Sequence, residues 1–522
     1  MSISSTLTIK RQSLLRSTTL VSLMTLFSRI LGFLRDMLLA YFFGAQAGAD
    51  AFYVAFRIPN FMRRLFAEGA FSQAFVPVLT EYQTHHSTTE IRTFIARVSG
   101  HLGLVLTIIT VIGIIAAPLI IALFAPGFGA GSTRTVLAMG MLRITFPYLL
   151  FISLTAMAGA LLNAYGYYGV PAFTPVLLNI SMIVAACYLS PYFSTPVIGL
   201  AWGVCIAGVV QLLFQLPFLY RRGLLVMPQL SRRDPGVRKV LKLMVPALFG
   251  VSIAQLNLMV DSIFASFLPV GSVSWLYMTD RLTDFPLGVF GVAIATVILP
   301  HLSRRHVELD HGRFSIELDW GLRFILLIAL PAALGLMLFS MPMIATAFGY
   351  GKFMTSDVLQ TQKSLITLSL GLPAFMTVKV LASGFYAKQD IKTPVKVGAW
   401  SMLVNSILCG ILIFPLAHAG LTLASALAGY VNAGSLFIIL VRRGIYQPRA
   451  GWKKYCMKLI TANSVLVSYL WIVLHDVAFW MHLRLVPRGL LLLGLVAGAV
   501  ILYMGVLYIL GLRVADFRHK EV

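Results

Sequence analysis

The chain has 522 residues, of which 59% are hydrophobic and only 11% are charged. This composition is typical of a polytopic membrane protein and excludes an ordinary soluble domain. The net charge of +23 does not indicate nucleic-acid binding, because the basic residues are distributed over short segments between long apolar runs. We therefore expect no nucleic-acid partner.

Apolar runs recur along the whole chain, and a run of about 20 residues suffices to cross a membrane as a helix. Backbone polar groups must be satisfied inside a bilayer, so the sequence predicts an all-α polytopic membrane protein. The predicted spans number about fourteen. They are 18–43, 50–81, 95–123, 136–162, 168–190, 196–219, 240–268, 272–302, 317–347, 362–386, 395–416, 418–441, 456–476 and 487–512.

The basic residues between the spans are asymmetric. If the N-terminus is inside, the inner segments hold most of the Lys and Arg residues. The outer segments then hold Arg134, Lys352, Lys363, Arg484 and Arg488. An excess of basic residues marks the cytoplasmic side. The sequence thus predicts that both termini are cytoplasmic.

An internal repeat divides the first twelve spans into two sets of six. The matching segments are 51–79 with 275–302, and 160–171 with 383–394. The first match places Arg57 opposite Arg281. Six is an even number, so both copies enter from the same side, which predicts two parallel lobes around a central cavity.

The repeat also predicts the domain boundaries. They are an N-terminal lobe over 1–219, a cytoplasmic amphipathic linker over 220–239, a C-terminal lobe over 240–442, and two further spans with a cytoplasmic tail over 443–522.

Charged residues occur within several predicted spans, where each costs roughly 2.5–3.5 kcal/mol at mid-bilayer depth. In the first span, Arg29 and Asp36 share a face because they are seven residues apart, as do Ser28 and Arg35. We expect Arg35 and Asp36 to neutralise each other in part. So many retained charges indicate a wet, cationic cavity and an anionic passenger, although some of them could serve only to hold helices together.

Two other spans carry charges of the same kind. The predicted substrate-binding residues are Ser28, Arg29, Arg35 and Asp36 in the first span, Asp50, Arg57, Arg63 and Glu68 in the second, and Asp280 and Arg281 in the eighth. Arginine suits a diphosphate because its planar guanidinium donates two parallel hydrogen bonds and stays charged. We expect Arg29, Arg35 and Arg281 to converge on such a group.

A lone carboxylate, Asp261, stands in the seventh span and is a candidate cation or proton site. Asn405 in the eleventh span could supply an oxygen ligand for Na⁺. Alternatively, Asp261 could bond a neighbouring helix. The sequence shows no metal-ligand spacing, no nucleophile–base arrangement and no phosphate-binding loop, so we expect a transporter rather than an enzyme, without a resident cofactor.

Three segments carry a resemblance to a known family. They read FSRILGFLRD at 27–36, ADAFYVAFRIPNFMRRLFAEGAFSQAFVPVLTEY at 49–82 and GFYAKQDIKTPVK at 384–396. Together they resemble the MurJ (MviN) family of bacterial lipid II flippases, in the MOP exporter superfamily. The similarity extends over the whole chain.

The resemblance implies a function in peptidoglycan biosynthesis. Members carry lipid II, an undecaprenyl-diphosphate-linked precursor, from the inner to the outer leaflet of the cytoplasmic membrane. The two extra helices would form a hydrophobic groove for the polyprenyl tail. Further implied partners are membrane lipids and the cell-wall synthesis machinery. The family's functional positions match Ser28, Arg29, Arg35 and Asp36 on helix 1, Asp50, Arg63 and Glu68 on helix 2, and Arg281 on helix 8.

The energy source stays open, with a sodium ion at Asp261 or the membrane potential as candidates. Other functions also remain open at this stage. They are a flippase for another polyprenyl-diphosphate-linked saccharide, a multidrug or cation antiporter of the same superfamily, a membrane enzyme acting on polyprenyl diphosphate, and a non-transporting scaffold. An antiporter would favour carboxylates and aromatic residues over clustered arginines in its cavity.

Overall fold

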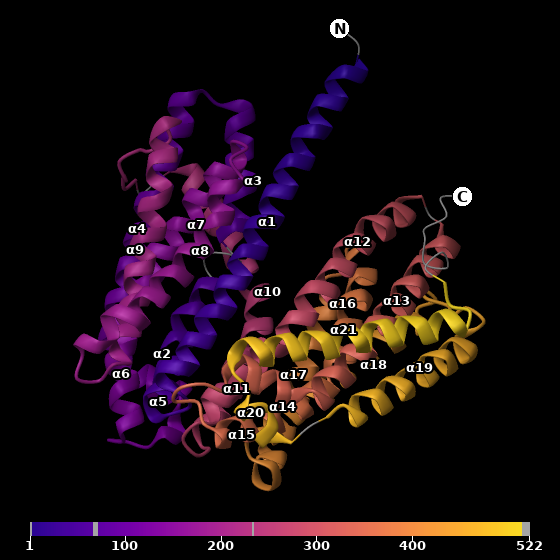
Figure 1. The fold of residues 1–522 in the computed structure, drawn as a ribbon. Helices are drawn as coiled ribbons and strands as arrows, with labels where there is room; N and C mark the ends of the chain where they lie inside the picture. The colour runs from indigo at the N-terminus through magenta and orange to yellow at the C-terminus, as the bar shows by residue number, and fades with distance from the viewer. Residues whose placement is uncertain (1–2, 66–70, 232–233, 309, 475, 514–522) are drawn as a thin grey trace. The chain divides into compact units, whose positions relative to one another are not determined.

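The computed structural model describes residues 3–65, 71–231, 234–308, 310–474 and 476–513, and its regular elements there are helices (Figure 1). The chain divides into two compact units, Met1–Val270 and Gly271–Val522. We describe each unit by itself.

The helices of the N-terminal unit are α1 (Ile3–Phe43), α2 (Ala47–Arg63), α3 (Ser72–His85), α4 (Thr88–Ile115), α5 (Ala117–Phe124), α6 (Thr133–Thr145), α7 (Tyr148–Ala164), α8 (Gly169–Val184), α9 (Ile198–Arg221) and α10 (Pro235–Ser266). Short turns of 3₁₀-helix, η2 (Pro126–Phe128) and η4 (Ser190–Tyr192), and of π-helix, η3 (Ala185–Leu189), connect some of them.

The helices of the C-terminal unit are α11 (Ser272–Pro286), the π-helical η5 (Leu287–Gly291), α12 (Val292–Val307), α13 (His311–Leu338), α14 (Ser340–Phe348), α15 (Thr355–Leu370), α16 (Leu372–Tyr386), α17 (Lys392–Leu416), α18 (His418–Arg442), α19 (Trp452–Ile472), α20 (Val477–His482) and α21 (Leu485–Ile509).

The all-helical membrane fold is confirmed. Eleven helical stretches of the described part are long and apolar enough to cross a membrane, and each coincides with a predicted span. The three other predicted spans, 18–43, 50–81 and 240–268, correspond to α1, to α2 with α3, and to α10. Charges in α1 and α2 lower the hydropathy of those segments. The total of fourteen spans stays a prediction.

The internal repeat is visible in which helices pack together. In the N-terminal unit α2 packs on α6, α7 on α9, and α8 on α9; in the C-terminal unit α11 packs on α15, α16 on α18, and α17 on α18. A π-helical turn follows α2 at residues 64–65, and the π-helical η5 follows α11 at the equivalent place. The two copies therefore share both their packing and a local irregularity.

A further repeated sequence ends the last helix of each copy. The segment Leu219–Gly223 at the end of α9 matches Leu440–Gly444 at the end of α18 in four of five residues. Gly223 and Gly444 have φ of 65° and 66°, a left-handed conformation that favours glycine and ends helices. The two chain ends thus leave their helices in the same way.

The predicted linker 220–239 is irregular over 224–231. The Gln229 amide donates to the Ala96 carbonyl of α4 at 2.8 Å. Gly100 allows this close approach, because a Cβ there would lie 2.2 Å from the Gln229 carbonyl oxygen. The linker is therefore bound to α4 through its backbone.

Asp234 begins α10 and also fixes it to α4. Its carboxylate accepts from the Val237 amide at 2.9 Å and from Arg97 at 2.5 Å. Burial acts to raise the pKa of Asp234, but the bonds to the Val237 amide and the Arg97 guanidinium outweigh it and hold the pKa below its usual range.

The helix pair α19–α21 lies against the C-terminal unit through an apolar cluster that includes Phe339, Tyr455 and Tyr503. Two buried polar clusters reinforce it. In the first, the Asp319 carboxylate of α13 forms an ion pair with Arg323 at 2.8 Å and accepts hydrogen bonds from Tyr446 and Trp452, both at 2.7 Å, and from the Arg449 amide at 3.3 Å. This group binds the loop between α18 and α19 to α13.

The second cluster is centred on Arg488 in α21, which is only 2% exposed. Its guanidinium donates to the carbonyls of Ala345 and Gly349 at 2.6 and 3.3 Å, and to those of Met481 and Leu483 at 3.0 and 2.8 Å. These carbonyls lie at the ends of α14 and α20, where helix carbonyls lack partners and the helix dipole favours a cation. Arg488, counted above among outer-segment charges, is therefore a buried cap.

Candidate substrate-binding site

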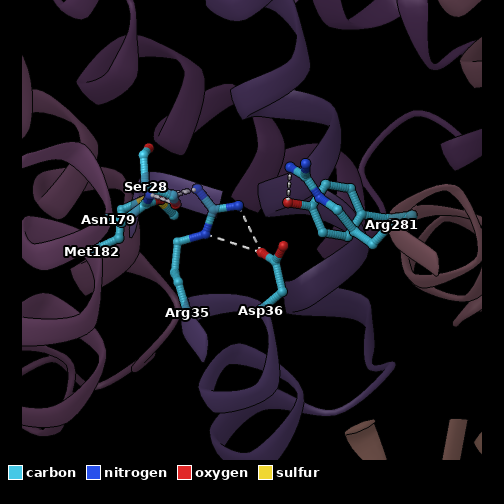
Figure 2. Close-up of polar contacts among 7 residues, drawn as sticks. Ser28, Arg35, Asp36, Asn179, Met182 and Arg281 are labelled. Carbon is cyan, nitrogen blue, oxygen red and sulfur yellow. Dashed lines mark hydrogen bonds and ion pairs between the residues drawn. The ribbon is translucent and has the colours of Figure 1, made fainter. Parts of the chain in front are cut away.

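The predicted pair on α1 forms in the structure (Figure 2). Arg35 and Asp36 are 4% and 1% exposed. Nε and Nη2 of Arg35 both donate to Oδ1 of Asp36, at 3.0 and 2.7 Å. Partial neutralisation of the two charges, expected from their adjacency, is thus confirmed by contact.

Arg35 has a further partner on α8. Its Nη1 donates to Oδ1 of Asn179 at 3.1 Å and approaches the Met182 sulfur at 3.7 Å. The Asn179 amide nitrogen donates in turn to the Ser28 carbonyl at 3.0 Å. One buried amide therefore holds the Arg35 guanidinium and joins α1 to α8, which pack along each other.

Arg29 differs from Arg35 in its surroundings. It is exposed, and so are Leu26, Phe27 and Ile30 around it. This part of α1 presents one cation within an apolar surface. Such a surface suits a ligand that has both an anionic group and a hydrocarbon chain.

The predicted residues of α2 occupy three different environments. Asp50 is fully buried, whereas Arg57 and Arg63 are half-buried. Nη1 of Arg57 donates to the Ser262 hydroxyl of α10 at 2.5 Å, and Nε of Arg63 donates to Asn60 one turn earlier at 3.0 Å. Glu68 lies outside the described residues.

In the C-terminal unit, Arg281 lies on α11 (Figure 2) and contacts Tyr277 one turn earlier. Its Nη2 donates to the Tyr277 hydroxyl at 2.7 Å, and its Cζ is 4.8 Å from the centre of the ring. Hydrogen bond and cation–π contact together fix the orientation of the guanidinium. Asp280 and Arg281 are both half-buried.

The two residues of the predicted cation site belong to different units. Asp261 is half-buried on α10, next to Ser262. Asn405 on α17 is 1% exposed, and its Oδ1 accepts from Ser425 at 3.3 Å and contacts the Cys409 sulfur at 3.7 Å. Within the described ranges, no group of three His, Cys, Asp or Glu residues is placed to hold a metal ion.

Two functional candidates were missed from the sequence. Asn179 is a single amide in an apolar span, and Ser262 is a small hydroxyl residue next to Asp261. Polar residues in a span are uncommon enough to attract attention. Only the three-dimensional packing shows that Asn179 of α8 contacts Arg35 and that Ser262 of α10 contacts Arg57.

These features define a helical membrane protein that keeps arginine side chains buried or half-buried within its apolar helices. Its fold is shared by a solved multidrug-resistance transporter, a MATE family member of the MOP superfamily in an inward-facing conformation. That structure matches with a TM-score of 0.67 at 16% identity, over 80% of this chain and 94% of the other.

Closer matches identify the family. Residues 39–490 match the family described as lipid II flippase MurJ. The chain is 46% identical over 512 residues to the "probable lipid II flippase MurJ" of Vibrio cholerae, covering 97% of this chain and 98% of the relative. A solved structure titled "Lipid II flippase MurJ, inward closed conformation" matches with a TM-score of 0.79 at 28% identity, over 94% and 98% of the two chains.

The chain belongs to the MurJ family of lipid II flippases. The resemblance predicted from its three segments is confirmed, as is the expectation of a transporter rather than an enzyme.

Proposed function

We propose that this protein carries lipid II from the inner to the outer leaflet of the bacterial cytoplasmic membrane by alternating access, with both termini in the cytoplasm. The observation that carries the proposal is its membership of the MurJ family over nearly the whole chain. The retained arginines at membrane depth supply the chemistry that an anionic lipid needs.

The diphosphate of the lipid first contacts Arg29, which is exposed among apolar side chains. Arg35 is already bound to Asp36 and Asn179, so it reaches the diphosphate only by exchanging one of these partners. Arg281 contributes from the C-terminal lobe. Bound anion lowers the repulsion among the cations, which permits the two lobes to close and then to reopen outside.

The polyprenyl tail stays in hydrocarbon, in a groove along the α19–α21 helix pair. No covalent step is involved. Net flow follows consumption of lipid II in the outer leaflet, and the membrane potential can bias the cycle by about 2.3 kcal/mol per charge per 100 mV. A sodium ion at Asp261, with Asn405 as a further ligand, is the alternative energy source in this proposal.

The test is exposure of lipid II at the outer surface of cells depleted of their own flippase. Cells receive wild-type protein, Arg35→Ala or Arg35→Lys at matched membrane levels, and an outside-only probe reports lipid II. We expect wild type to restore exposure and Arg35→Ala to abolish it. Arg35→Lys keeps the charge but loses the planar guanidinium, so we expect partial function at most.

Arg313→Ala is the matched control, because Arg313 is exposed and its ion pair with Asp310, at 3.3 Å, is exposed as well. It should restore exposure fully. Normal exposure in depleted cells that have no other carrier would refute lipid II as the substrate. Full function of Arg35→Ala would instead refute the role of the arginines.

A further inference from the structure

The two copies of the repeat differ at their inner ends in one charged contact. In the C-terminal unit, Nη1 of Arg443 pairs with the Asp390 carboxylate at 2.8 Å, and Nη2 donates to Thr393 at 3.2 Å. Arg222 is the equivalent of Arg443 in the N-terminal unit, and Tyr167 is the equivalent of Asp390. The carboxylate of one copy is thus a phenol in the other.

Arg222 is held by Tyr167 without being neutralised. Its Nε donates to the Tyr167 hydroxyl at 2.7 Å, Nη2 also contacts that hydroxyl, and Cζ lies 4.6 Å from the ring centre. In the part of the chain that the structure describes, no carboxylate pairs with Arg222, and its side chain is exposed. An oriented, uncompensated cation attracts an external anion.

A pocket of about 380 Å³ is connected to this cation through Tyr167, which contacts Arg222. Tyr167 is one of its lining residues, and the others come from α1, from the start of α8 and from α9, including Met24, Phe173 and Phe214. The lining is mainly apolar. Its volume is within the roughly 300–1,000 Å³ of small-ligand sites.

We propose that this pocket binds an anionic phospholipid, with one acyl chain in the pocket and the phosphodiester on Arg222. One uncompensated arginine matches the single negative charge of a phosphodiester better than the higher charge of a diphosphate. The bound lipid connects the inner part of α1 with α8 and α9. This binding does not depend on the transport of lipid II.

The test uses the full-length protein in nanodiscs of phosphatidylethanolamine that contain phosphatidylglycerol with a diazirine on one acyl chain. After illumination, mass spectrometry of peptides locates the label. We expect label on the segment 166–173 or on Phe214, and excess phosphatidylglycerol should displace it. One arginine near an anionic headgroup corresponds to about a fivefold preference, so Arg222→Gln should lower the labelling about fivefold.

Three further variants separate the causes. Arg443→Gln removes the equivalent arginine of the other copy and should leave the labelling unchanged. Tyr167→Phe keeps the cation and the ring, so labelling should persist. Met24→Trp fills the pocket and should reduce labelling even though Arg222 is intact. Unfolding temperatures measured on the same samples identify variants that lose labelling because they misfold.

Three results would overturn the proposal. Labelling that is unchanged in Arg222→Gln would show that the cation has no role. Equal labelling by a phosphatidylethanolamine probe would show an apolar surface without selectivity for charge. Displacement by undecaprenyl diphosphate but not by phosphatidylglycerol would assign the pocket to the tail of the transported lipid.

Discussion

Replacing Asp319 by alanine should destabilise the attachment of the α19–α21 pair more than any exposed substitution nearby. The carboxylate is 3% exposed, accepts from Tyr446 and Trp452 at 2.7 Å, and forms an ion pair with Arg323 at 2.8 Å. Removing the carboxylate leaves the Tyr446 and Trp452 donors without a partner, at a total cost of about 2–6 kcal/mol, since each unpaired buried donor costs about 1–3 kcal/mol. We expect a loss in that range.

The measurement is unfolding of purified protein by SDS in mixed micelles, followed by tryptophan fluorescence. Asp319→Asn should lose less than Asp319→Ala, because its amide oxygen still accepts from Tyr446 or Trp452. Arg313→Ala breaks an exposed pair on the same helix and should change stability by about 0–1 kcal/mol.

A double-mutant cycle with Arg323→Ala isolates the ion pair. A coupling energy near zero, or an Asp319→Ala protein as stable as the Arg313→Ala control, would refute the argument that this carboxylate holds the α18–α19 loop to α13.

Three other predictions follow from buried or closely packed positions. Arg488→Ala leaves four carbonyls without their donor and should lower the free energy of unfolding by about 3 kcal/mol or more, whereas Arg488→Lys should lose less. Thermal stability measured by size exclusion checks this, and two variants as stable as wild type would contradict it. Gly100→Ala places a Cβ against the Gln229 backbone and should lower the free energy of unfolding by about 1–3 kcal/mol. The displaced linker should then be cut faster by protease, and an unchanged rate of cleavage would refute the close approach. Because the pKa of Asp234 is lowered in the folded protein, its contribution to the free energy of unfolding is complete above the ordinary carboxyl pKa of about 3.9 and is lost as the pH falls through the lower folded pKa. Asp234→Asn should therefore flatten the acid side of the curve of stability against pH. A curve that does not change would exclude this role.

Much of the candidate site could be predicted from the sequence because its charges are conspicuous in an apolar background. The Arg35–Asp36 contact joins consecutive residues of one helix, so local spacing was sufficient to predict it. The repeat was detectable for a similar reason, since equivalent segments kept their residues at nearly constant offsets. Predicted roles for Arg29, Arg281 and Asp261 rest on residue type and resemblance.

Partners that are distant in the sequence could not be found in this way. Asn179 lies 144 residues from Arg35, and hydropathy contains no information on which span packs against which. For the same reason α10, the first helix of the predicted second lobe, was not expected to pack with α3, α4 and α5 in the N-terminal unit.

The sequence by itself determined that this protein is a helical, repeated membrane transporter with cations at membrane depth, because composition, span length and residue spacing are local properties. The tertiary structure alone decided that Arg488 is a buried helix cap, that Asp319 accepts from three donors, and that Arg222 contacts a phenol where Arg443 contacts a carboxylate. Each of these depends on atoms brought together by packing, and packing depends on the three-dimensional fit of whole helices rather than on the order of their residues.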